Sequence, residues 1–253
     1  QASDRTSFVD DVQIHVYDAN ITGRESAVGI VIQSMSTGSA FWSDVEFEVT
    51  GVYMSSVGIA AGIGIVTPQW TNLDGDDVRF EVTDSIVSAE DAFGIVFGNR
   101  NQLSLFQSTL QSFIMTVNTT RLISQSGSAF GVGWQNIQSN TCRFLNAVIS
   151  VSAEFESANS IGILLNNCLF QNTSFVDSFF QFNGNSTTGI LISGGALPTL
   201  ISTDLISPHS QIVIQSEPVG GMDGGLEPLP TNSQDLLDLG SARTKRGLDG
   251  STG

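Results

Sequence analysis

Three aspartates around one glycine form the best candidate for a metal site in this sequence. Asp74, Asp76 and Asp77 supply hard carboxylate oxygens, and Gly75 between them would let a loop bend around an ion. Ca²⁺ prefers oxygen ligands of this kind. An acidic turn between two strands gives the same pattern and is the commoner explanation. Calcium is therefore the one candidate cofactor, and no other cofactor is predicted.

The sequence contains few residues whose types and spacing suit a catalytic site. His15 and His209 are the only histidines, and neither follows the pattern of an activated nucleophile. Asp44 and Asp77 stand at the start of two similar stretches, the nearest approach to the carboxylate pair of a glycosidase. Charges that keep strand edges from pairing wrongly explain them equally well. Enzymatic activity stays open, and a non-enzymatic role is favoured.

The charge balance excludes one large class of partners. Nine basic residues against 25 acidic ones give a net charge of −16, and Lys245 is the only lysine. Nucleic acid binding requires clustered Lys and Arg, so it is not expected. No run of eighteen apolar residues occurs, so membrane insertion is not expected either.

A strand-like pattern repeats along the chain about every 33 residues. Residues 45–50 and 78–83 both alternate apolar and polar side chains, as a half-buried strand does. Further copies precede and follow them, and their last apolar residues are Val16, Val49, Val82, Val117, Val151, Phe182 and Ile214. These end points follow one another at nearly even steps, which predicts one structural unit used repeatedly.

A glycine followed by Ile or Val marks a second point in each repeat. Gly58 competes with Gly62 for this place in the second repeat, but Gly62 keeps the spacing. We expect these glycines to bend the backbone at a corner or to let neighbouring coils approach closely. They are Gly29, Gly62, Gly94, Gly131, Gly162 and Gly189. A third apolar stretch in each repeat is marked by Phe41, Trp70 or Leu73, Phe106, Phe144 and Phe175.

Three short strands per repeat predict an all-β solenoid, with coils stacked about 4.8 Å apart. We expect about six to seven coils over residues 10–217, after an N-terminal extension at 1–9, with Val49, Val82 and Val117 in one interior column. In this architecture the chain resembles the right-handed parallel β-helix superfamily, which includes pectate-lyase-like enzymes, phage tailspikes and surface adhesins. The resemblance concerns the repeat and transfers no catalytic motif.

The repeat ends before an irregular tail rich in Gly and Pro, residues 218–253. A short helix could form at 232–239. We expect the tail to take part in assembly, with an apolar anchor at Leu236, Leu237 and Leu239. The only basic cluster would meet the acidic solenoid of another copy; it consists of Arg243, Lys245 and Arg246.

Export from the cell is favoured by composition. The chain starts at Gln1 rather than Met and nearly lacks lysine, as expected of a secreted or cell-surface protein that has lost a signal peptide. Cys142 and Cys168 are too few for a disulfide framework, and the repeat places them out of register with each other, so a buried thiol pair is favoured over a bridge.

The repeat favours an extracellular structural protein. We expect a self-assembling filament or surface-fibre subunit, or an adhesin, whose coils associate through unpaired end strands and terminal tails. Its partner is then another copy of the chain. The alternative is a carbohydrate-binding or carbohydrate-cleaving β-helix protein of tailspike, lyase or hydrolase type, for which carbohydrate would be the ligand.

Overall fold

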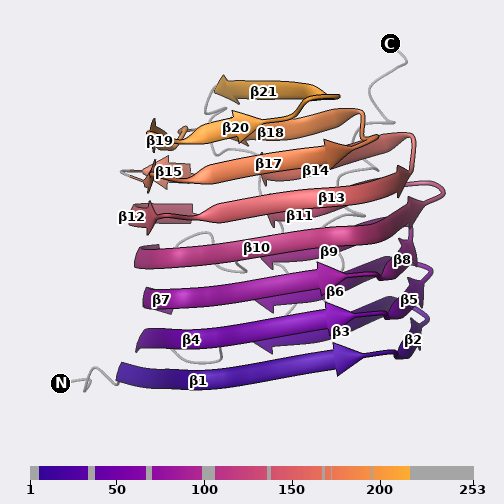
Figure 1. The fold of residues 1–253 in the computed structure, drawn as a ribbon, viewed down its shortest axis with the longest axis horizontal. Helices are drawn as coiled ribbons and strands as arrows, with labels where there is room; N and C mark the ends of the chain where they lie inside the picture. Colours follow the sequence, from indigo (N-terminus) through magenta and orange to yellow (C-terminus); the bar gives the residue numbers. More distant parts are fainter. Residues whose placement is uncertain are drawn as a thin grey trace, which may run out of the picture.

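The protein is a parallel β-solenoid (Figure 1). The computed structural model describes residues 6–33, 38–66, 70–98, 106–135, 138–166, 169–171, 173–194 and 196–216. Every regular element in these ranges is a β-strand, and the strand pairs are parallel. The prediction of an all-β solenoid is therefore confirmed. A search of the same ranges finds no helix with the length and hydropathy needed to span a membrane.

One long strand per coil builds most of a fourteen-stranded sheet. In the first four coils this strand is β1 (Thr6–Tyr17), β4 (Gly38–Thr50), β7 (Trp70–Thr83) and β10 (Phe106–Ser124). Short strands continue the first three beyond a corner, namely β2 (Asn20–Gly23), β5 (Tyr53–Ser56) and β8 (Ile86–Ala89).

Later coils divide the long strand. The pieces are β12 (Gln138–Leu145) and β13 (Val148–Glu156), then β15 (Leu169–Gln171), β16 (Ser174–Val176) and β17 (Phe179–Gly184), and finally β19 (Thr199–Ile201) and β20 (Asp204–Ile206).

A seven-stranded sheet closes the other side of the coils. Each coil adds one strand to it. They are β3 (Ser26–Gln33), β6 (Ile59–Val66), β9 (Asp91–Gly98), β11 (Ser128–Gln135), β14 (Asn159–Asn166), β18 (Thr188–Gly194) and β21 (Gln211–Ser216). Strands β1 to β3 make up the first coil, and strands β19 to β21 make up the last coil.

Like residues of successive repeats lie over one another. Val49 pairs with Val82, and Val82 with Val117. All three valines are 0% exposed, so they form the predicted interior column. The predicted repeat of about 33 residues per coil is confirmed, because strand pairing joins residues that the repeat had made equivalent.

Two columns of described residues have left-handed backbone, one with a member in every coil and the other with members in the first four coils. The first column has φ between 47° and 52° and consists of Asp11, Asp44, Asp77, Ser112, Asn146, Asp177 and Ser202. The second has φ between 45° and 67° and consists of Asp18, Gly51, Asp84 and Thr119. Asp and Asn tolerate this conformation because their short polar side chains can bond locally. The regular spacing of Asp44 and Asp77 therefore has a backbone cause.

The repeated glycines allow close approach and do not form the corners. A Cβ added to Gly94 would lie 2.5 Å from the carbonyl oxygen of Gly131 and 2.7 Å from a methyl of Val117. A Cβ added to Gly62 would likewise lie close to a glycine carbonyl oxygen in the next coil and to a valine methyl. This confirms Gly62 as the repeat glycine in preference to Gly58. Of the two roles expected, the structure supports closeness between coils and between the two sheets.

The predicted markers of the third apolar stretch were partly wrong. Phe41 is 39% exposed, whereas its neighbour Trp42 is 7% exposed and faces the core. The inward column runs from Trp42 through Gly75 and Leu110 to Phe144 and Phe175. Because Phe41 and Trp42 are adjacent and both aromatic, composition alone did not show which one points inward.

Ile212 and Ile214 were also assigned to the wrong sheet. They lie in β21, which pairs with β18 of the seven-stranded sheet. In the larger sheet the last coil instead places Leu205 beside Phe180. The last coil is shorter than the coils before it, so a step of the usual length from Phe182 overshoots into the next strand.

Candidate functional site

Charged side chains occupy two neighbouring outward columns of the larger sheet in the first three coils. Strand alternation turns the interior column inward and leaves the residues on either side of it outward. His15, Glu48 and Glu81 follow one another in one outward column across β1, β4 and β7. Gln13, Glu46 and Arg79 form the neighbouring column.

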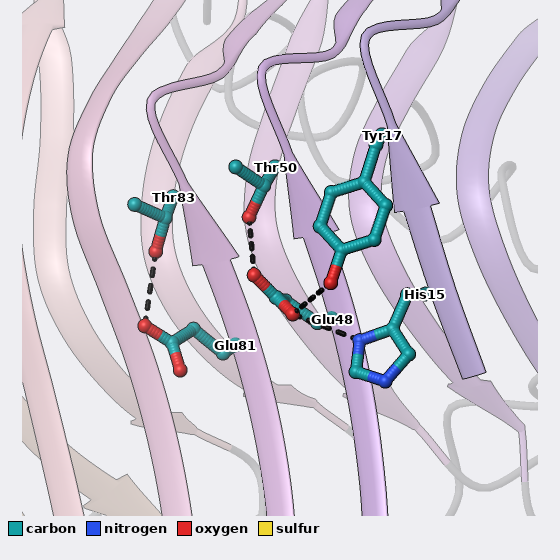
Figure 2. A network of polar contacts seen from close by, with 6 residues as sticks. All are labelled: His15, Tyr17, Glu48, Thr50, Glu81 and Thr83. Carbon is teal, nitrogen blue, oxygen red and sulfur yellow. Dashed lines mark hydrogen bonds and ion pairs between the residues drawn. The ribbon is translucent and has the colours of Figure 1, made fainter. Parts of the chain in front are cut away.

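Glu48 is the centre of a hydrogen-bonded cluster (Figure 2). Its Oε2 accepts a bond from the Tyr17 hydroxyl at 2.7 Å and lies 2.8 Å from His15 Nδ1. Its Oε1 accepts a bond from the Thr50 hydroxyl at 2.7 Å. The rings of His15 and Tyr17 stack with centroids 5.5 Å apart. One carboxylate of the second coil therefore fixes two rings of the first coil.

These contacts determine the proton affinity of the cluster. The Tyr17 hydrogen bond, followed by that of Thr50, lowers the pKa of Glu48 below its ordinary value. The same bond to Glu48 raises the pKa of Tyr17 to about 12. A general acid needs a raised pKa, so Glu48 is suited to orienting its neighbours and poorly suited to donating a proton.

The next coil repeats part of this arrangement. The Thr83 hydroxyl donates to Glu81 Oε1 at 3.1 Å, as Thr50 does to Glu48 (Figure 2). Both bonds join residues two positions apart on one face of a strand. The repeated Glu-Val-Thr sequence therefore produces a repeated surface contact.

The predicted acid pair occupies equivalent corner positions, but each member has a local partner. Asp44 accepts a bond from the Ser43 hydroxyl at 3.0 Å. Asp77 pairs with Arg79, with Nε 2.9 Å from Oδ1. Asp77 is thus held by a guanidinium and Asp44 by a hydroxyl, and a role of the two as an acid pair stays a prediction.

The calcium candidate lies within a strand and not in a loop. Asp74, Asp76 and Asp77 are all part of β7, so the expectation of a glycine-hinged loop was wrong. Asp74 Oδ1 accepts the backbone N–H of Thr109 at 2.9 Å. In the ranges that the structure describes, no three His, Cys, Asp or Glu side chains are grouped for a metal ion. Calcium binding here stays a prediction.

Several other predicted residues have no part in this cluster. His209 is exposed in the segment between β20 and β21, and Cys142 is buried in β12. Outside the described residues lie Cys168, the expected helix at 232–239, and the assembly residues Leu236, Leu237, Leu239, Arg243, Lys245 and Arg246.

Sequence reasoning did not single out Asp91 as a buried acid. Asp91 is 3% exposed at the start of β9, and its Oδ1 accepts the Ser128 N–H at 3.0 Å. Its Oδ2 is buried without a hydrogen-bond partner. Burial raises the pKa of Asp91 above its ordinary value. Gly127 makes the space, because a Cβ there would lie 2.6 Å from Asp91 Oδ1.

Both end coils of the solenoid, which lie at opposite ends of the stack in Figure 1, contain exposed aliphatic side chains. In the first coil, Ile14 is 43% exposed although its column is buried in the coils above it. In the last coil, Ile212 is 40% and Ile214 46% exposed. Their partners Ile190 and Ile192 in β18 are 0% and 1% exposed. These column positions are thus apolar to the end, and the described residues leave Ile14, Ile212 and Ile214 partly exposed there.

Comparisons with known proteins found no matching family model, no matching curated protein and no matching solved structure.

Proposed function

We propose that this chain is an extracellular structural protein, a subunit of a filament or surface fibre, whose solenoids associate through their coil ends. An adhesin of the same construction is included in this proposal. The observation that carries it is the exposure of Ile14 at one end and of Ile212 and Ile214 at the other. Burying such side chains against a second molecule would stabilise the contact by about 25 cal/mol for each Å² of apolar surface.

The end strands carry little that would block such a contact. Proteins usually protect sheet edges with charges or prolines. The strands of the two end coils contain three acidic residues, Asp10, Asp11 and Asp204, and no Lys, Arg or Pro. Among the described residues no strand pairs with the outer edge of β1 or β21, so the backbone groups there can accept another strand.

A contact between the first coil of one copy and the last coil of another uses two different surfaces. Such a heterologous contact leaves one free end of each kind, so it propagates unless it closes into a ring. A fibre is the expected product.

The extracellular location rests on composition alone. Charged residues make up only 13% of the chain, and one lysine is present. Antibody labelling of intact source cells tests this part: signal without permeabilisation is expected, and signal only after permeabilisation contradicts it.

Sedimentation velocity and negative-stain electron microscopy test the assembly. We expect large, concentration-dependent species and fibres for the full chain. Ile14→Asp and Ile214→Asp should each reduce them strongly, because each buries a charge at the joint. Val57→Asp is the matched control and should leave assembly unchanged, since Val57 is 75% exposed in the second coil, which is not part of the proposed joint. A chain that stays monomeric at every concentration overturns the proposal.

A further inference from the structure

The register of the two sheets specifies how one copy would meet the next. Each interior column can be followed from the first coil to the last through the pairs of adjacent strands. If a second copy continued the stack, the end residue of a column would lie against the first residue of the same column. The chemistry of these end pairs then decides whether a continuous joint is favourable.

Four inward columns can be followed through the whole solenoid. In the larger sheet, one column begins at Val9 and ends at Leu200, and another begins at Ile14 and ends at Leu205. In the seven-stranded sheet, one begins at Ile30 and ends at Ile212, and another begins at Ile32 and ends at Ile214. Every end residue is aliphatic, so the joint would repeat the kind of contact that fills the core.

The outward columns meet without repulsion. The same register brings Asp10 against Ile201, Gln13 against Asp204, and His15 against Ile206. None of these pairs joins like charges, which would destabilise directly opposed strands.

The corner at the joint also matches. Asp11 and Ser202 are the first and last members of the left-handed column, with φ of 51° and 47°. Both ends therefore turn at the same register position, so strands on both sides of the corner can pair at once.

We propose that the partner of each coil end is a second copy of this chain in this same register, so that both sheets continue across the joint. This inference rests on the proposed function and specifies its contact. Val9, Ile14, Ile30 and Ile32 of one copy lie on Leu200, Leu205, Ile212 and Ile214 of the next.

Cysteine pairs at outward positions test the register in the full chain. Val31 and Val213 are the ends of one outward column and would be neighbours across the joint. Adjacent parallel strands lie about 4.8 Å apart, within the Cα separation that a disulfide spans. The double variant Val31→Cys/Val213→Cys should give a reducible ladder of dimers, trimers and longer species on oxidation.

The matched control shifts one cysteine along the strand. In Val31→Cys/Gln211→Cys the two Cα atoms would be about 8 Å apart, too far for a disulfide. This variant, the single variants and the wild-type chain should give no ladder. A second pair in the other sheet, Gln13→Cys/Asp204→Cys, should give the same ladder. It tests the same register if the first double variant does not fold.

The outcomes separate this inference from the proposed function. If fibres form but neither pair cross-links their subunits, or the control cross-links them equally, the proposed register is overturned. The proposed function as a fibre subunit then still stands. Dimers from Val213→Cys alone indicate two last coils in contact and also overturn it. Monomers in every sample overturn the register and the proposed function together.

Discussion

The middle and the ends of this solenoid are built from the same columns but differ in what covers them. Ile149 and Ile14 belong to one interior column, yet Ile149 is 0% exposed and Ile14 is 43% exposed. The sequence of the column does not become polar toward the end. An end coil whose residues resemble those of the interior is suited to packing against another molecule. The proposed assembly rests on this difference in exposed fraction between residues of one column.

The largest expected effect compares these two isoleucines directly. Ile149→Ala should destabilise the dilute, monomeric protein by about 2–5 kcal/mol, because it removes fully buried methyl groups and leaves a cavity. Ile14→Ala should cost clearly less, about 1 kcal/mol, because its side chain is already partly in water. Urea unfolding of both variants measures this. Equal losses would mean that the first coil is covered in the monomer.

Glycine substitutions test how closely the two sheets approach each other in the middle of the solenoid. Gly94→Ala should destabilise the protein by about 1–3 kcal/mol, since the new methyl would overlap the Gly131 carbonyl and Val117. Gly64→Ala is the control in the preceding strand of the same sheet. Its nearest contact would be an ordinary 3.5 Å to Val28, so stability should change little. Thermal unfolding compares them, and similar losses at both positions would contradict the close approach.

Burial of Asp91 predicts a specific pH dependence. Because its pKa is raised in the folded protein, the folded state binds more protons than the unfolded state above the ordinary pKa of Asp. The contribution of Asp91 to the free energy of unfolding therefore falls as the pH rises from the ordinary pKa of Asp through the raised pKa of Asp91. Unfolding of Asp91→Asn measured across this range should lack that decrease.

Glu90→Gln, one position earlier, serves as the control for Asp91 and should retain the decrease. A wild-type decrease that persists unchanged in Asp91→Asn would show that another group causes it.

The smallest expected effect concerns the cluster near the first coil. In a Tyr53→Phe background, ultraviolet titration should give a Tyr17 pKa of about 12. Glu48→Gln removes the charged hydrogen-bond acceptor and should bring this pKa down toward the ordinary value near 10. Glu81→Gln, one coil further along, should leave it unchanged. A Tyr17 pKa that is the same in all three proteins would contradict the geometry of Figure 2.

The sequence predicted the repeat well because alternation in a strand and spacing between coils are both periodic. The column of Val49, Val82 and Val117 and the choice of Gly62 follow from that periodicity alone. Prediction failed where periodicity breaks. The last coil is shorter than the coils before it, so Ile212 and Ile214 were placed in the wrong sheet.

Features that depend on one local contact were not predictable from spacing. The burial of Asp91 depends on the space beside Gly127, a neighbour in the next coil. The corner columns were missed for another reason. Asp44 and Asp77 were considered as carboxylates, whereas their shared property is the left-handed backbone. One Asp, Asn or Ser at the equivalent position of every repeat is the signal that could have shown it.

Cryo-electron microscopy of the concentrated full chain tests the central claim most directly. Each strand of the seven-stranded sheet represents one coil, so head-to-tail stacking predicts a filament with an axial rise of about 34 Å per subunit at about 4.8 Å per coil. Density for both sheets should continue across every joint. Separate single-chain particles, or filaments in which the solenoids touch only along their sides, would contradict it.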